Sequence, residues 1–210
     1  MNIKILASGS GGNVALVNDS FLIDCGMTYS WTINKLKHIL PAAILVTHEH
    51  SDHAKAVPQF LKRLVDIYLT KGTAAALGLE DNFCLRFIRP GTIFQIGNVK
   101  ILPFNTFHDA ADPVGFILRD DNERVLFLTD TGKLPRFNGY FDKIFIEANF
   151  STETLLNSDT NYALKQRILA NHLSIDKVKN FLAQQPQAHV QLLHQSKKHL
   201  KEVSHNVNRF

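Results

Sequence analysis

Three histidines and one aspartate lie within six residues, in the segment His48-Glu49-His50-Ser51-Asp52-His53. The apolar run Ala42–Val46 comes before this segment and predicts a buried strand, because it is short, continuous and contains β-branched residues. Side chains at alternate positions of a strand point the same way, so the first two imidazoles would project together as the strand ends. The aspartate and the third imidazole would lie on the turn beyond. Two imidazoles can share one metal ion, and a carboxylate with another imidazole can hold a second.

Ligands for two metal ions must also come from other strand ends, because one strand end cannot surround an ion. A sheet that presents several strand ends along one rim would collect such residues in a cleft. Two divalent ions roughly 3.5–4 Å apart can share a hydroxide and stabilise an in-line displacement. Neutral imidazoles and ionised carboxylates favour zinc, although manganese tolerates the same set. Three later residues each follow an apolar strand and could complete the site: His108, His194 and Asp130, the last being best placed to bridge both ions.

Two further residues have the chemistry of proton transfer rather than of metal binding. Glu147 ends the apolar segment Lys143–Glu147, where a structural core would favour an aliphatic residue. His172 stands in a polar gap between two predicted helices. An imidazole there could protonate a leaving oxygen while a carboxylate orients it. The alternative is that His172 only ends a helix.

The predicted strands fall into two groups, and helices follow each group. Two sheets packed face to face with helices outside satisfy this order, which predicts an α/β protein with an αββα four-layer sandwich. A chain of 210 residues suits one domain, residues 1–210. The first group has strands at 3–7, 14–18, 21–24, 42–47 and 66–70, with helices near 31–40, 58–64 and 73–79. The second has strands at 85–88, 92–96, 99–104, 114–118, 124–128, 143–147 and 188–193, with helices at 161–170 and from Ser174 onward.

Composition sets broad limits on function and location. The net charge of +4 is compatible with a polyanionic substrate without requiring one. No apolar run approaches a membrane span, and the N-terminus lacks the apolar core of a signal peptide. With only two cysteines and no disulfide framework, we expect a cytoplasmic protein, and a homo-oligomer is compatible with the sequence. The remaining features are assigned structural or surface roles: Cys25 packed at a strand end, His38, His189, His199, His205, and the basic Lys197, Lys198 and Lys201.

The histidine-rich segment matches the HxHxDH signature of the metallo-β-lactamase fold. Other segments resemble the small bacterial YycJ/WalJ-type subgroup, described as DNA exonucleases or phosphodiesterases. Ribonuclease Z, the tRNA 3′-processing endonuclease, is similar in its Asp-Thr-Gly, strand-end Glu, later His-Ser and final strand-end His. This chain has no long insertion that could form the tRNA-gripping arm of ribonuclease Z, so tRNA maturation is disfavoured. The segments that carry the subgroup resemblance are Ser8–Asn13, Leu22–Gly26, Phe107–Phe116, Ile146–Asn149 and His172–Ser174.

The resemblance implies a role for each candidate residue. Glu147 and His172 would correspond to the pair that assists proton transfer to the leaving group, and Asp52 would hold the proton of the attacking hydroxide as well as binding metal. The implied ligands are His48, His50 and His108 for the first ion, and Asp52, His53 and His194 for the second, with Asp130 bridging.

The leading hypothesis is therefore a dinuclear metal-dependent phosphodiesterase, in which a metal-bridging hydroxide attacks phosphorus. Nucleic acid, DNA or RNA, is the first candidate substrate. A small cyclic nucleotide is the nearest alternative on the same site. A lactamase, lactonase or thioesterase is a second class, which the Glu147–His172 pair and the Gly-rich opening disfavour. A non-catalytic metal-binding module is a third class, disfavoured because every expected ligand is present.

Overall fold

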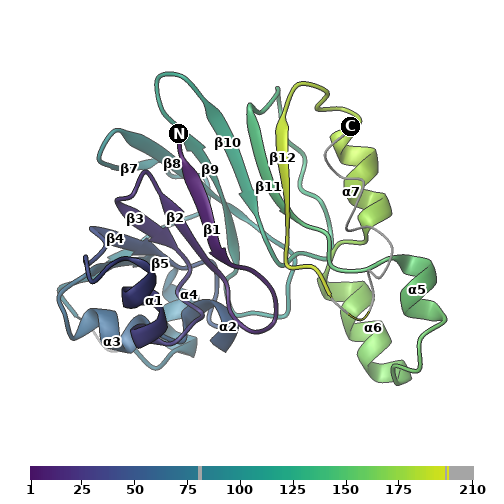
Figure 1. Ribbon diagram of the computed structural model, residues 1–210, viewed down its shortest axis with the longest axis horizontal. Coiled ribbons are helices and arrows are strands. Elements are labelled where there is room, and N and C mark those ends of the chain that lie inside the picture. Colours follow the sequence, from purple (N-terminus) through teal and green to yellow (C-terminus); the bar gives the residue numbers. More distant parts are fainter. Residues whose placement is uncertain (80–81, 197, 199–210) are drawn as a thin grey trace. The chain divides into compact units, whose positions relative to one another are not determined.

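The strands form two six-stranded sheets in the computed structural model, which describes residues 1–79, 82–196 and 198 (Figure 1). The strand orders are β1-β2-β3-β4-β5-β6 and β12-β11-β10-β9-β8-β7. By their contacts, the residues divide into two compact units. The first unit contains Met1–Asn105 and Ala110–Val114, and the second contains Thr106–Asp109 and the described residues from Gly115 onward.

The first sheet places one edge of parallel strands beneath the histidine-rich segment. β1, β2 and β3 are antiparallel neighbours, whereas β3, β4, β5 and β6 run parallel. Because the carboxyl ends of parallel strands meet at the same edge, the residues after β3 and β4 converge there. The strands are β1 (Ile3–Ala7), β2 (Val14–Val17), β3 (Phe21–Ile23), β4 (Ala43–Leu45), β5 (Asp66–Leu69) and β6 (Leu85–Phe87).

Helices of the first unit pack on this sheet through one apolar cluster. Leu22, Ile44 and Ile67 of the strands share that cluster with Val57 and Phe60 of α3, and all five are fully or almost fully buried. Burying a side chain of this size contributes roughly 1.5–3 kcal/mol. The cluster therefore fixes the sheet edge to which the ligand segment is attached. The helices are α1 (Tyr29–Lys35), α2 (Ser51–Ala54), α3 (Val57–Leu61) and α4 (Lys71–Ala76).

Two predicted helices end earlier than expected. α1 ends at Lys35, and His38 has the left-handed φ of 64°, so Ile39 (69% exposed) lies outside the helix instead of on its buried face. Leu64 was likewise expected within a helix. It follows α3 with φ 62° and is 65% exposed.

The second sheet also ends in a set of parallel strands. β9 and β10 are antiparallel, whereas β10, β11 and β12 run parallel. Their shared carboxyl edge carries Asp130 after β10, Glu147 as the last residue of β11 and His194 after β12. The strands are β7 (Phe94–Ile96), β8 (Val99–Asn105), β9 (Val114–Arg119), β10 (Arg124–Leu128), β11 (Lys143–Glu147) and β12 (His189–Leu193).

Three helices follow in the second unit: α5 (Thr152–Leu156), α6 (Tyr162–Asn171) and α7 (Ile175–Leu182). The predicted start of the last helix at Ser174 is confirmed, since the Ser174 hydroxyl caps α7 by accepting a hydrogen bond from the Lys177 amide. Val178 and Leu182 of this helix are buried. α5 and α2 were not predicted. Each is about one helical turn long, too short for an apolar periodicity to appear.

The features expected to be structural agree with the fold where they can be seen. Cys25 is buried and both cysteines are free, while His38 and His189 are exposed. Lys198 pairs with Asp159 at 2.8 Å. His199, His205, Lys197 and Lys201 lie outside the described residues. Within the part of the chain that is described, no helix combines the length and the apolarity needed to cross a membrane.

Candidate metal centre

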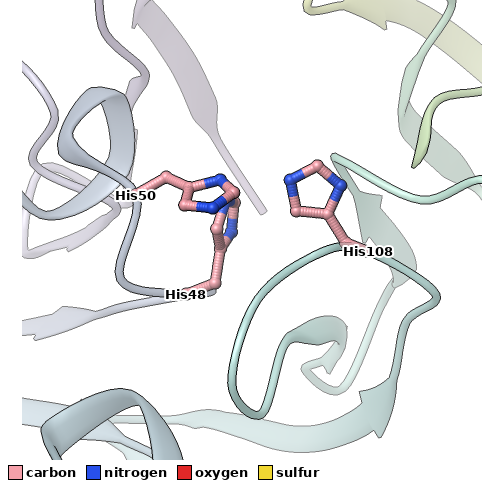
Figure 2. A group of neighbouring side chains, drawn as sticks. All are labelled: His48, His50 and His108. Atoms are coloured by element: carbon pink, nitrogen blue, oxygen red, sulfur yellow. The ribbon is translucent and has the colours of Figure 1, made fainter. Parts of the chain in front are cut away.

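The first unit brings three imidazoles together after β4. The rings of His48 and His50 meet edge to face with centroids 4.7 Å apart, and Figure 2 shows both on the segment that leaves β4. The ring of His53 lies 4.1 Å from that of His48. The expected open turn is instead a turn of helix, because the carbonyl of His50 accepts hydrogen bonds from the amides of His53 and Ala54 at 2.8 and 2.9 Å. Asp52 and His53 are therefore held by helical backbone.

Asp24 orients the ring of His53 through a hydrogen bond with Nδ1. Its Oδ2 lies 2.7 Å from Nδ1 of His53, and its Oδ1 accepts the backbone N–H of Thr47 at 2.8 Å. Burial raises the pKa of Asp24, although the neighbouring His53 and Thr47 act in the opposite direction. A carboxylate that accepts the Nδ1 proton leaves the Nε2 lone pair of the same ring for a metal. This role was missed, although Asp24 lies in a segment that carried the family resemblance.

A glycine allows the backbone of this ligand turn to lie against the end of β3. The amide of Asn13 donates to the carbonyl of Asp52, and that of Cys25 donates to the carbonyl of His53, both at 2.7 Å. At Gly26 a Cβ would lie only 1.7 Å from the Asp52 carbonyl oxygen. No other residue fits there unless the ligand turn moves, so Gly26 positions Asp52 and His53.

In the second unit, one carboxylate faces two imidazoles. Oδ2 of Asp130 lies 3.6 Å from Nε2 of His108, which Figure 2 draws on the loop after β8. Oδ1 of Asp130 lies 3.7 Å from Nε2 of His194. Both distances exceed a hydrogen bond. Donor atoms about 2.0–2.1 Å from a tetrahedral ion are roughly 3.4 Å apart, so the spacing fits pairs of ligands to shared ions. Each carboxylate oxygen of Asp130 lies nearest to a different imidazole, an arrangement that fits a carboxylate bridging two ions.

Neighbouring backbone and amide groups fix the two imidazoles. Nδ1 of His108 lies 3.1 Å from the carbonyl oxygen of Asn171, so that nitrogen donates its proton there and Nε2 keeps its lone pair. Burial lowers the pKa of His108, although Asp130 acts in the opposite direction. This favours the neutral imidazole that binds metals. Nδ2 of Asn149 lies 3.0 Å from Nδ1 of His194. The sequence had not singled out Asn149 as a contact of the centre.

Three residues around the ligands have left-handed backbone conformations. The φ angles are 60° for Asp24, 34° for Asp130 and 46° for His194. Non-glycine residues in this region are uncommon and are typically strained by about 1–3 kcal/mol. Such strain persists only where the surrounding contacts determine it, and here each residue ends or follows a strand of a buried sheet. Within each unit, the strained positions therefore lie at strand ends that carry a proposed ligand or the hydrogen-bond partner of one.

Glu147 and His172 form the pair expected from the sequence. Oε2 of Glu147, which is fully buried, lies 2.9 Å from Nδ1 of His172, and Oε1 accepts the Thr131 amide at 2.5 Å. Burial raises the pKa of Glu147. Burial lowers that of His172, but the hydrogen bond and charge of Glu147 outweigh it, so the pKa of His172 is raised overall. Donor atoms of four residues lie within 4.8 Å of one another: Asp130, Glu147, His172 and His194.

Comparison with known proteins places this geometry in a family. Residues 20–195 match the family model of the beta-lactamase superfamily domain. The chain belongs to the beta-lactamase superfamily. It is 33% identical over 192 residues to the exodeoxyribonuclease WalJ of Streptococcus pneumoniae, a match that covers 81% of this chain and 71% of the relative.

Two solved structures share the fold of this chain. The metallo-β-lactamase fold protein YhfI from Bacillus subtilis has a TM-score of 0.70 and 16% identity, covering 92% of this chain and 85% of its own. Human tRNase Z, short form, has a TM-score of 0.68 and 16% identity, and the match covers 94% of this chain and 93% of the tRNase Z chain. At these identities the similarity shows the fold alone. The predicted metallo-β-lactamase fold is confirmed, and the nuclease-named relative supports the predicted metal-dependent phosphodiesterase.

Proposed function

We propose that this superfamily member hydrolyses phosphodiester bonds of nucleic acid with the help of two divalent metal ions. The observation that carries the proposal is the Glu147–His172 pair beside Asp130. A buried carboxylate that orients an imidazole can deliver a proton to a leaving oxygen. Lactam hydrolysis does not account for that pair, and a phosphodiester substrate agrees with the name of a relative at 33% identity, an exodeoxyribonuclease.

Seven residues would hold the ions, with zinc as the first candidate. When bound, the ions would supply Lewis acidity and lower the pKa of water towards roughly 7. Imidazole and carboxylate donors of this kind suit zinc. The proposed ligands are His48, His50 and His108 for one ion and Asp52, His53 and His194 for the other, with Asp130 bridging.

The protein's own groups would divide the proton transfers. Asp52 is partly exposed, with 23% of its side chain accessible, and would accept the proton of the attacking water. His172 would donate its Nε2 proton to the leaving oxygen. Glu147 would keep His172 charged, because the carboxylate at 2.9 Å stabilises the imidazolium.

The other expectations from the sequence stay predictions. They are one domain over residues 1–210, a cytoplasmic location and compatibility with a homo-oligomer.

A set of metal-dependent cleavage assays tests the function. Metal-loaded protein is offered linear and circular DNA, RNA, and 3′,5′-cyclic nucleotides, at low and high salt. We expect nucleic acid to be cleaved, with binding that weakens steeply as salt rises, because binding a polyanion releases counterions. Preference for a cyclic nucleotide with little salt dependence would replace nucleic acid as the substrate.

Two histidine variants give a matched comparison. His172→Ala should reduce kcat by roughly 10²–10⁴-fold, the usual contribution of a general acid. His189→Ala removes an exposed imidazole on β12, outside the proposed centre, and should leave kcat unchanged. Asp52→Ala should abolish cleavage. Failure to cleave any phosphodiester, or cleavage of a β-lactam or thioester instead, would refute the proposal.

A further inference from the structure

An exposed aromatic ring stands directly beside the candidate metal centre. Phe107 precedes His108 in the chain and is 49% exposed. Its backbone is fixed on both sides, since its amide donates to Oγ1 of Thr131 at 3.0 Å and its carbonyl accepts the Gly132 amide at 2.7 Å. The ring is therefore presented by rigid backbone rather than by a loose loop.

A positive charge accompanies this ring. Nζ of Lys133 lies 5.3 Å from the centroid of the Phe107 ring, within the range of a cation–π contact. Two more cations lie on neighbouring elements: Nζ of Lys177 donates to the carbonyl of Gly132 at 3.2 Å, and Nε of Arg167 donates to Asp109 at 2.7 Å. All of these cationic side chains are exposed.

Single exposed apolar side chains are common and by themselves need no explanation. Phe107 differs because three independent features coincide on it. The next residue is a proposed metal ligand, the backbone is held by two hydrogen bonds, and a lysine covers the ring. An aromatic face combined with flanking cations is the arrangement that binds single-stranded nucleic acids, where bases stack on rings and cations meet phosphates.

We propose that Phe107 and Lys133 bind the unpaired end of a nucleic acid strand. Phe107 stacks on one base, and Lys133 contacts a neighbouring phosphate. A base inside a duplex is covered on both faces, so only an unpaired or terminal base can offer a face to this ring. The inference rests on the proposed function and adds to it a preference for strand ends and single strands.

Binding measurements test the inference. They use the Asp52→Ala background, which keeps the strand intact, and fluorescence anisotropy with a labelled single-stranded DNA. A polymer of abasic nucleotides with the same charge serves as the second ligand. We expect Phe107→Ala to weaken binding of the DNA by roughly 5- to 100-fold, the usual range for loss of one stacked base, and to leave binding of the abasic polymer unchanged.

Three further variants separate stacking from folding and from charge. Phe107→Trp should retain DNA binding, because it keeps an aromatic face. Phe83→Ala removes a phenylalanine that is 72% exposed elsewhere in the chain, and should change nothing. Lys133→Ala should weaken the binding of both polymers. It should also reduce the salt dependence of that binding by the amount expected for about one phosphate contact.

The outcomes distinguish this inference from the proposed function. Suppose that wild-type protein cleaves DNA, but Phe107→Ala binds DNA as tightly as the parent or loses affinity for DNA and for the abasic polymer equally. The proposed stacking of a base on Phe107 is then refuted, and the proposed function stands. If wild-type protein neither binds nor cleaves nucleic acid, both are refuted. The stacking proposal is supported if Phe107→Ala loses affinity for DNA but not for the abasic polymer, and if Phe107→Trp keeps the affinity for DNA.

Discussion

Gly26→Ala should disable the metal centre without replacing any ligand. The new Cβ would lie 1.7 Å from the carbonyl oxygen of Asp52 and 2.1 Å from its carbonyl carbon. Since non-bonded heavy atoms need about 3.5 Å, the turn that carries Asp52 and His53 must move by roughly 2 Å. A displacement of about 1 Å at a reacting group can reduce a rate by about 10²-fold, so kcat/KM should fall at least that far. Overpacking should also destabilise the fold by about 1–3 kcal/mol.

The assay compares this variant with a second glycine substitution in the same region. Gly11→Ala introduces a Cβ that meets nothing within 4 Å, so it should keep wild-type activity, metal content and thermal stability. Metal bound per chain is measured by elemental analysis after dialysis, beside kcat/KM and thermal unfolding. We expect Gly26→Ala to bind less than its full complement of metal. A Gly26→Ala protein with full metal content and activity within about threefold of wild type would refute the packing argument.

Three other predictions follow from the same contacts. Glu147→Gln should move the alkaline limb of the kcat profile to lower pH, because the raised pKa of His172 depends on the carboxylate and protonated His172 is lost as pH rises through that pKa. An unmoved limb would exclude His172 as the acid. Asp24→Asn should weaken metal binding about 10- to 100-fold in a competition titration, because it removes the carboxylate that orients His53 through Nδ1. Equal affinity would contradict that role. Chelation should abolish cleavage and lower the unfolding temperature, and zinc should restore both; activity that survives full metal removal would count against the metal-dependent mechanism.

Most of the sheet framework could be predicted from sequence because its strands are short apolar runs between turn residues. All twelve predicted strands are observed, with bounds within about two residues. The turn after β2 is an example, since Asn18 and Asp19 have φ of 50° and 52°, the pair of left-handed residues that a tight hairpin requires. The strand at 85–88 was expected in the second group, but β6 pairs with β5 in the first sheet. Helix ends were predicted less well. Ile39 and Leu64 fit a helical period, but the chain leaves the helix before them.

The candidate centre was predictable where its residues follow strands. His108, Asp130, Glu147 and His194 each end or follow a strand, and within the second unit the parallel order of β10, β11 and β12 brings the last three to one edge. The supporting residues could not be found in this way. Asp24 and Asn149 act through contacts with residues 29 and 45 positions away, and nothing local marks a contact of that range.

Asp24 in the first unit and Glu147 in the second are buried carboxylates that are placed for chemistry rather than for stability. Burial raises the pKa of both Asp24 and Glu147. In the metal-free protein, a carboxylate with a raised pKa takes up a proton on folding, so stability falls as pH rises from its unfolded value through the folded one. A carboxylate kept for stability would show a lowered pKa instead. Each of these carboxylates contacts an imidazole: Asp24 contacts His53, and Glu147 contacts His172. The negative charge of Asp24 therefore orients a proposed metal ligand, and that of Glu147 stabilises the protonated form of His172, although both charges destabilise the fold.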